Sequence, residues 1–324
     1  MTRTIGRSGI EVGDIGIGTW AIGGPFHSTT GSALGWGEVD DEESIRMLHR
    51  AVELGANLID TADVYGAGHS ETVIGRAFTG RRDDVVIATK WGNTYDEASK
   101  VMGPEDRSPE YVRIALEKSL RRLQTDHVDV LQLHVSVPVE IAGELVAACD
   151  KLLDEGKIRA YGWSTDDLDR AELFADAHAS VIQHELNVLG DAPEMLALCE
   201  RHDLASFNRS PLAMGLLSDK ITADTRIGGA DIRATNPEWL RWFVDGRPAP
   251  EFLARRDAIR EILRGGGRTL AQGALAWNLA RSPRTIPLPG CRTLQQVEEN
   301  LGTLHKAALT AEEMAEIARL STVD

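Results

Sequence analysis

Four side chains that could together polarise a carbonyl group and protonate its oxygen lie at or just beyond the ends of apolar runs of this chain. They are Asp60, Tyr65, Lys90 and His134. A lysine ammonium within about 4–6 Å of a tyrosine stabilises the phenolate and lowers a pKa that is ordinarily about 10. A carboxylate can hold that ammonium, and a neutral histidine can donate a hydrogen bond to a carbonyl oxygen. The set predicts a site that polarises an aldehyde or ketone and protonates its oxygen.

This chemistry needs a source of hydride that no side chain supplies. The reductant must be a cofactor, and a nicotinamide dinucleotide fits that role. Each residue also has a structural interpretation when taken singly: an aspartate as a helix cap, a lysine as a surface charge, a histidine as a buried core residue. Four such residues in succession argue against coincidence. The sequence holds no His-x-x-x-His, no His/Cys cluster and no paired acids at ligand spacing, so we expect no metal.

Short β-rich runs alternate with longer segments of helical period, and these elements must position the four groups. Because nearly every strand is followed by a helix, the pattern predicts a closed (β/α)8 barrel or an open doubly wound sheet. The length of 324 residues favours the barrel. The carboxyl ends of barrel strands open onto one face, so the four groups would converge at one mouth. Strands are predicted at residues 15–18, 58–60, 85–89, 128–133, 158–163, 181–183, 204–207 and 285–287.

Helix ends and extra segments complete the predicted fold. One helix begins near Asp41 and ends at Gly55, where glycine can take the left-handed conformation. Residues 1–12 are expected to form a capping hairpin, and residues 215–250 a long loop after the seventh strand. We expect one domain over residues 1–324, with an extra amphipathic helix at its carboxyl end. Further helix starts are indicated by Ser108-Pro109 and by capping boxes at Thr269/Gln272 and Thr310/Glu313.

Residues 16–21, Gly-Ile-Gly-Thr-Trp-Ala, match the loose dinucleotide fingerprint, and Glu38 and Asp40 follow at about the expected distance. That fingerprint works only where a helix begins at the glycines and directs its N-terminus at the pyrophosphate. Here residues 23–25 are Gly-Gly-Pro and a Ser/Thr/Gly segment follows, which cannot form that helix. We therefore interpret the match as a loop at a strand end and reject a Rossmann fold.

Composition limits the partners. Fifty acidic against thirty-five basic residues give a net charge of −15, which argues against nucleic acid but not against a small phosphorylated ligand. No run approaches the ~20 apolar residues of a membrane span, and no signal-peptide core follows the N-terminus. Cys149, Cys199 and Cys291 are widely spaced and are expected to be reduced thiols. We expect a cytoplasmic protein and leave its oligomeric state open.

The ordered motifs resemble the aldo-keto reductase family over most of the chain, from Gly18-Thr19-Trp20 to Glu299-Asn300. Residues 60–66, Asp-Thr-Ala-Asp-Val-Tyr-Gly, are similar to the most characteristic motif of that family. The resemblance implies a (β/α)8 barrel with NADPH extended across its mouth. It also implies a catalytic tetrad of Asp60, Tyr65, Lys90 and His134, in which Tyr65 is the general acid.

The resemblance also implies cofactor contacts along the mouth. Thr165 stands where the family usually has asparagine, and Arg209 replaces an aromatic ring, with a guanidinium that could stack instead. At the adenosine end many members have a lysine and an arginine where this chain has Gly290 and Gln296. Arg292 is the remaining cation of that motif, and it can bind a phosphate bidentately, so we expect NADPH in preference to NADH. The full set is Gly18, Thr19, Trp20, Ser164, Thr165, Gln183, Arg209, Ser210, Leu212, Gly215, Lys220, Gly290, Arg292, Gln296, Glu299 and Asn300.

The substrate pocket is expected to combine the reacting groups Tyr65 and His134 with an apolar wall from Trp20 and Trp91. Three aromatic residues of the long loop either close over the substrate or anchor that loop to the barrel rim. No arginine cluster indicates a strongly acidic substrate, so we expect a neutral aldehyde, ketone or sugar-derived carbonyl. The pattern most resembles bacterial members acting on sugars, polyols or general aldehydes. The three aromatic residues are Trp239, Trp242 and Phe243.

Two other functions fit a barrel of this kind. A cofactor-sensing regulatory protein, like the potassium-channel β subunits, would keep the tetrad and bind NADP(H) with little or no turnover. A barrel enzyme of other chemistry, such as a phosphate-using lyase, would require the tetrad to be a coincidence. Consumption of NADPH in the presence of a panel of aldehydes, ketones and sugars separates both from a reductase.

Overall fold

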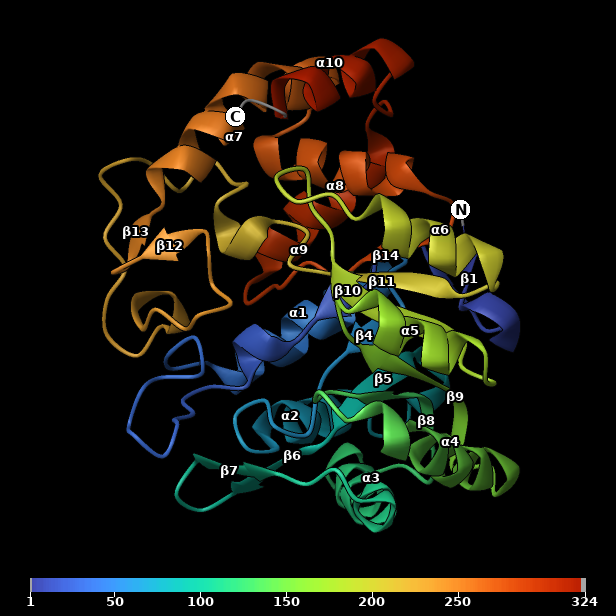
Figure 1. The fold of residues 1–324 in the computed structure, drawn as a ribbon. Coiled ribbons are helices and arrows are strands. Elements are labelled where there is room, and N and C mark those ends of the chain that lie inside the picture. Colours follow the sequence, from blue (N-terminus) through green and yellow to red (C-terminus); the bar gives the residue numbers. More distant parts are fainter. Residues whose placement is uncertain (1, 322–324) are drawn as a thin grey trace.

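Eight parallel strands curl into a barrel in the computed structural model, which describes residues 2–321 (Figure 1). Their order in the sheet is β14-β11-β10-β9-β8-β5-β4-β3. The ring closes where the Gly16 and Gly18 amides donate to the carbonyls of Pro287 and Pro289, both at 3.0 Å. This confirms the predicted (β/α)8 barrel. The strands are β3 (Ile17–Gly18), β4 (Leu58–Asp60), β5 (Val86–Trp91), β8 (Val128–Leu133), β9 (Ile158–Ser164), β10 (Val181–Glu185), β11 (Ala205–Arg209) and β14 (Thr285–Pro287).

Helices surround the barrel and begin where the sequence signals indicated. Asp40 caps the first helix, Ser108 caps the third, and Thr269 forms a reciprocal capping box with Gln272. Two helices stand outside the barrel repeat, α7 and the expected C-terminal α10, and they pack against each other (Figure 1). The helices are α1 (Asp41–Glu53), α2 (His69–Ala77), α3 (Pro109–Leu123), α4 (Val139–Asp154), α5 (Leu168–Ala175), α6 (Pro193–Arg201), α7 (Pro250–Arg264), α8 (Leu270–Arg281), α9 (Leu294–Leu301) and α10 (Ala311–Ser321). Among the described residues, no helix has the length and apolar character needed to cross a membrane.

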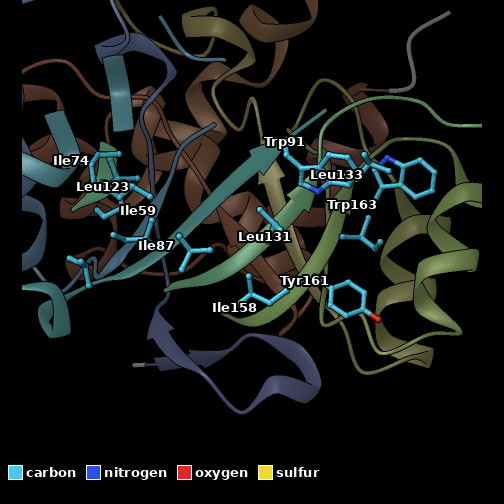
Figure 2. Packing of buried hydrophobic residues seen from close by; sticks show 14 of the residues in the cluster. Ile59, Ile74, Ile87, Trp91, Leu123, Leu131, Leu133, Ile158, Tyr161 and Trp163 are labelled. Atoms are coloured by element: carbon cyan, nitrogen blue, oxygen red, sulfur yellow. The ribbon is translucent and has the colours of Figure 1, made fainter. Parts of the chain in front are cut away.

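Strand alternation divides the apolar core into two layers. Side chains such as Val86, Ala88 and Val130 fill the inside of the barrel. The alternate positions face outward and pack under the helices, and Trp91 and Trp163 are among them (Figure 2). A side chain on β5 therefore points into the barrel or into the helix shell according to its parity.

The two ends of the barrel are covered differently. The predicted N-terminal hairpin is present: β1 (Thr2–Thr4) pairs antiparallel with β2 (Glu11–Gly13). Ile5 and Ile10 of this segment belong to the same apolar cluster as the barrel interior. The Arg3 guanidinium donates to the carbonyl of Ser282, just before β14, at 2.9 Å. The hairpin thus covers the amino ends of the strands and leaves the other end as the mouth.

Loops after three strands build the mouth. A second hairpin, β6 (Asn93–Asp96) with β7 (Val101–Glu105), follows β5 and was not predicted. The predicted long loop after β11 includes a short hairpin, β12 (Phe243–Val244) with β13 (Arg247–Pro248). Residues 19–40 after β3 meet this long loop, since the Ile232 amide donates to the Gly35 carbonyl at 2.8 Å. Figure 1 shows both loops at the same side of the barrel.

Candidate active site

A fully buried lysine links the predicted catalytic residues. Lys90 lies on β5 with its side chain inside the barrel and has no exposed surface. Its Nζ donates to Asp60 Oδ2 at 2.7 Å, to the Thr61 carbonyl at 2.8 Å and to the Tyr65 hydroxyl at 3.3 Å. Burial alone would lower the pKa of Lys90, but the charge of Asp60 and the contact with Tyr65 raise it overall. The ammonium form is therefore held at neutral pH directly beside the phenol.

Amide groups hold the carboxylate of Asp60. Its Oδ1 accepts hydrogen bonds from Gln183 Nε2 at 2.8 Å and from Gln132 Nε2 at 3.3 Å. The Thr19 hydroxyl donates to the Asp60 carbonyl at 2.8 Å. Sequence reasoning missed Gln132, although a single glutamine inside an apolar strand was a signal for a polar group pointing into the barrel. These contacts leave Asp60 rigid and directed at Lys90.

The loop carrying Tyr65 is fixed by backbone contacts. Gly66 has a φ of +61°, and a Cβ there would lie 1.7 Å from the Gly23 carbonyl oxygen, so only glycine fits. Lys100, in the turn between β6 and β7, donates to the Gly66 carbonyl at 2.9 Å. The unexpected hairpin thus supports the tyrosine loop from outside. The contacts of Gly66 with Gly23 and with Lys100 therefore fix the loop that places the Tyr65 phenol beside Lys90.

The pKa of Tyr65 corrects one expectation. We predicted that Lys90 lowers this pKa below its ordinary value, but burial raises it more than the charge of Lys90 lowers it. Lys90 and, more weakly, Arg209 still act in the predicted direction. The phenol is therefore protonated at neutral pH, as a proton donor must be. The ammonium reduces the cost of forming the phenolate.

His134 lies across the mouth from the tyrosine, directly after β8. The two rings are 5.9 Å apart between centroids and nearly perpendicular, at 81°. Burial, with the charges of Lys90 and Arg209, lowers the pKa of His134 well below its ordinary value. Its Nδ1 is buried and has no hydrogen-bond partner among residues 2–321. A neutral imidazole here can donate one hydrogen bond to a substrate oxygen.

The pocket wall differs in part from the prediction. Trp20 stacks on Tyr65 with 5.9 Å between ring centroids and 21° between planes, as a wall residue would. Trp91 does not line the mouth: its side chain is 1% exposed and packs beside Trp163 in the helix shell (Figure 2). It follows Lys90 on the same strand, and neighbouring side chains on a strand point to opposite faces.

The predicted nicotinamide contacts gather at the ends of β9, β10 and β11. The Thr165 amide donates to the Gln183 carbonyl at 2.8 Å, and the Thr165 hydroxyl accepts from the Asp167 amide at 3.1 Å. Ser164, the last residue of β9, is partly exposed beside them. Arg209 forms an ion pair with Asp166 and lies 3.8 Å from Glu185. The guanidinium is thus fixed at the rim, and the Arg209 side chain is still 35% exposed.

The turn after β11 has an unusual backbone. Ser210, Ala213 and Met214 have φ values of +53°, +46° and +55°, and Gly215 follows at +93°. Non-glycine residues rarely take this conformation, and such strain collects at ligand-binding turns. The amides of Ala213 and Gly215 already donate within the turn, to the carbonyls of Ser210 and Leu212, both at 2.9 Å. The predicted pyrophosphate residues Ser210, Leu212 and Gly215 are all partly exposed here, and Lys220 lies beyond them on the surface. Their place in a phosphate site stays a prediction.

The predicted adenosine end lies where α9 begins. Arg292 donates to the carbonyls of Trp36, at 3.0 Å, and Glu38, and its amide donates to Gln296 Oε1 at 2.8 Å. Arg292 therefore ties the loop after β3 to this end of the barrel. Three other residues were expected at this end. Gly290 is exposed and lies beside Gly18. The buried Asn300 side-chain amide donates to Cys291, and the Glu299 carbonyl accepts a hydrogen bond from Gln272.

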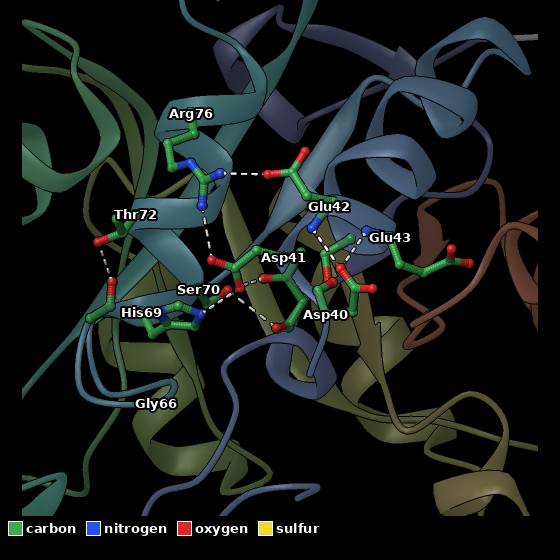
Figure 3. Close-up of polar contacts among 12 residues, drawn as sticks. Asp40, Asp41, Glu42, Glu43, Gly66, His69, Ser70, Thr72 and Arg76 are labelled. Atoms are coloured by element: carbon green, nitrogen blue, oxygen red, sulfur yellow. Dashed lines mark hydrogen bonds and ion pairs between the residues drawn. The ribbon is translucent and has the colours of Figure 1, made fainter. Parts of the chain in front are cut away.

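Acidic side chains at the start of α1 lie next to this end. The Leu294 amide at the start of α9 donates to Glu43 Oε1 at 3.3 Å. Asp41 binds His69 at 2.8 Å and Arg76 at 2.9 Å, and Glu42 binds the same arginine (Figure 3). Part of the negative charge is thus neutralised within the protein. Glu43 nevertheless brings a carboxylate to the helix start where a 2′-phosphate is expected.

The fold and the mouth together define a class of protein. A barrel whose mouth holds a protonated tyrosine, a buried ammonium and a neutral histidine is built to donate a proton and a hydrogen bond to one oxygen. Among the described residues, one group of side chains could hold a metal ion, and it lies at the carboxyl ends of α5 and α6: Glu172, Asp176 and His202. The mouth therefore holds the groups of a site that can polarise a carbonyl oxygen and protonate it.

Comparisons with known proteins agree with that class. The model of the Aldo/keto reductase family matches residues 14–322. Aldo-keto reductase YhdN of Bacillus subtilis is 31% identical over 91% of this chain and 86% of its own length. The NADH-specific methylglyoxal reductase of Escherichia coli is 32% identical over 93% and 92%. An aldo-keto reductase of Klebsiella pneumoniae, solved with NADPH, is 26% identical, covers 100% and 96%, and has a TM-score of 0.73. The chain belongs to the aldo-keto reductase family.

Proposed function

We propose that this protein reduces an aldehyde or ketone to an alcohol with hydride from NADPH, and that Tyr65 is the general acid. The observation that carries the proposal is the Lys90 amine, which lies 3.3 Å from the Tyr65 hydroxyl and 2.7 Å from Asp60. Family membership supports the class of reaction. The tetrad assignment rests on the geometry of these residues.

The steps performed by the protein follow from the protonation states. A carbonyl oxygen placed between Tyr65 and His134 accepts a hydrogen bond from each, which polarises the C=O bond. When bound, a reduced nicotinamide would supply the hydride for the carbonyl carbon. As negative charge develops on the oxygen, Tyr65 transfers its proton there, and the Lys90 ammonium stabilises the resulting phenolate. Asp60 keeps the ammonium in place, and solvent later returns the proton to Tyr65.

The residues at the mouth fit an extended dinucleotide. The left-handed turn at 210–215 would hold the pyrophosphate, and Ser164, Thr165 and Gln183 would lie at the nicotinamide. Arg292 would bind the 2′-phosphate of NADPH, and it must then exchange carbonyl partners in the loop after β3 for phosphate oxygens. One relative is NADH-specific and one solved neighbour holds NADPH. We therefore expect a modest preference for NADPH.

A spectrophotometric panel tests the proposal. The purified protein is mixed with NADPH, or with NADH, and with aldehydes, ketones and sugars, and absorbance at the nicotinamide band is followed. We expect turnover with aldehydes, faster with NADPH than with NADH at low concentrations of cofactor. Tight binding of NADPH without turnover of any carbonyl compound would instead indicate a cofactor-sensing protein.

A further inference from the structure

The three aromatic residues of the long loop divide into two kinds. Trp242 and Phe243 are each 1% exposed and belong to the apolar cluster that joins the loop to α7 and α8. Trp239 is 52% exposed. Trp242 and Phe243 therefore anchor the loop to the barrel rim, which was one of the two roles expected for these aromatic residues. Trp239 keeps a large apolar face open to solvent, which needs another explanation.

Trp239 extends the aromatic wall that begins at the acid. Its ring lies 6.0 Å from the ring of Trp20, centroid to centroid, and Trp20 in turn stacks on Tyr65 at 5.9 Å. Trp36 closes the other side of Trp20 with an edge-on contact at 5.7 Å. The open face of Trp239 is thus two ring contacts away from the phenol that would donate the proton. A substrate held at Tyr65 and extending outward would meet this face.

This wall offers ring faces and few polar groups. The Trp20 indole N–H donates to the Leu34 carbonyl at 3.1 Å, so its hydrogen bond is already made within the protein. The Trp36 ring is covered by the Arg233 guanidinium at 4.7 Å, and its indole N–H is buried. A hydroxylated chain placed against such a wall would lose hydrogen bonds to water and gain none. A flat apolar group would gain dispersion and burial.

The segment that carries Trp239 is held in a closed turn. The Asp245 amide donates to Asn236 Oδ1 at 2.7 Å, which joins the two sides of the segment. Within it, the Leu240 amide donates to the Pro237 carbonyl at 2.8 Å. Arg241 forms an ion pair with Glu185 at the end of β10. The turn is therefore tied to the barrel rim beside the indole, and Trp239 is already ordered before a ligand arrives.

We propose that Trp239 determines substrate specificity: it forms the outer wall of the pocket and selects carbonyl compounds with a flat apolar group, aryl aldehydes above hydroxylated ones. The inference rests on the proposed reductase function and narrows its substrate class. The ring contact of one aromatic group with another corresponds to about a 2- to 12-fold change in kcat/KM. Since the contact is remote from the reacting carbon, the change falls on KM.

Steady-state kinetics with benzaldehyde and with glyceraldehyde test the inference. In Trp239→Ala we expect KM for benzaldehyde to rise about 2- to 12-fold, with kcat and the kinetics of glyceraldehyde nearly unchanged. Trp239→Phe should restore most of the loss, since it keeps a ring. The matched control is Val244→Ala, which alters a residue of the same loop that is 54% exposed and should change neither substrate.

Two results would overturn the inference. One is an equal loss with both aldehydes in Trp239→Ala, which would mean that the indole supports the loop and does not contact the substrate. The other is unchanged kinetics with benzaldehyde. Both leave the proposed function intact, provided that the wild-type protein turns over an aldehyde. Absence of turnover with any carbonyl compound in the wild-type protein would instead refute the reductase function itself.

Discussion

Replacing Lys90 with methionine removes the ammonium and keeps a side chain of similar length. The Lys90 nitrogen lies 3.3 Å from the Tyr65 oxygen. At an effective dielectric constant of about 20, unit charges at that distance attract by about 5 kcal/mol. If half of the phenolate charge has developed in the transition state, the loss is about 2.5 kcal/mol, or about 70-fold in kcat. We therefore expect kcat to fall by at least about 70-fold, and by more if more than half of the charge has developed in the transition state.

The same substitution leaves Asp60 as an unpaired buried charge. Breaking such a pair costs about 3–5 kcal/mol of folding free energy, and here the lower end applies because Gln132 and Gln183 still donate to the carboxylate. A double variant, Lys90→Met with Asp60→Asn, removes both charges and should regain most of that stability. Its kcat should remain as low as that of the single variant. Urea unfolding and steady-state kinetics of the three proteins separate folding from catalysis.

The pH dependence gives a second readout of the same variant. Lys90 lowers the pKa of Tyr65 against the effect of burial, so its loss must raise that pKa further. The alkaline limb of the kcat profile, where the acid loses its proton, should therefore move to higher pH in Lys90→Met. Full activity in the stable double variant would show that the Lys90 ammonium is not needed for proton transfer. An alkaline limb that moves to lower pH in Lys90→Met would show that Lys90 does not lower the pKa of Tyr65.

Three further predictions concern other parts of the chain. Arg292→Ala should raise KM for NADPH about 10-fold or more and KM for NADH less than about 2-fold, because only NADPH carries the 2′-phosphate; equal changes in the two KM values would show that Arg292 does not bind that group. Trp91→Phe should lower the melting temperature and leave KM for aldehydes unchanged, because Trp91 is buried in the helix shell; a raised KM would restore it to the pocket wall. Asp63 is buried and receives no hydrogen bond from a side chain among the described residues, and burial raises its pKa well above the ordinary value. The pKa of an aspartate in the unfolded chain is about 3.9. At pH values between this and the higher pKa of folded Asp63, the folded protein holds a proton that the unfolded chain has lost. The free energy of unfolding therefore falls as the pH rises through this range. Asp63→Asn should then raise the free energy of unfolding at pH 7.5 and raise it much less near pH 4, as measured by urea unfolding; a loss of stability at pH 7.5 would contradict this.

The barrel could be predicted because its strands are short, apolar and followed by helices with clear caps. Asp40, Ser108 and Thr269 mark helix starts by local chemistry, which acts within a few residues and is visible in the sequence. The convergence of polar residues at strand ends follows from the parallel topology. The hairpin β6–β7 was not predicted, because its place depends on long-range contacts such as that of Lys100 with the Gly66 carbonyl.

The site was harder to predict in detail. Trp91 was placed in the pocket wall although the alternation of a strand puts it opposite Lys90, so that signal was present and was not used. Gln132 could have been found by the same alternation. The partners of Arg292 are backbone carbonyls of Trp36 and Glu38, and a carbonyl group has no residue-specific signal in a sequence. The net pKa of Tyr65 depends on burial, which only the packed structure gives.

Removal of one oxygen atom tests the central claim most directly. Tyr65→Phe keeps the ring that stacks on Trp20 and deletes the proposed proton donor. The kcat for the best aldehyde should fall by about 100- to 1,000-fold. The affinity for NADPH, measured by fluorescence quenching, should equal that of the wild-type protein. A Tyr65→Phe protein that reduces the aldehyde at the wild-type rate would show that another group protonates the oxygen, and the account of this mouth would be wrong.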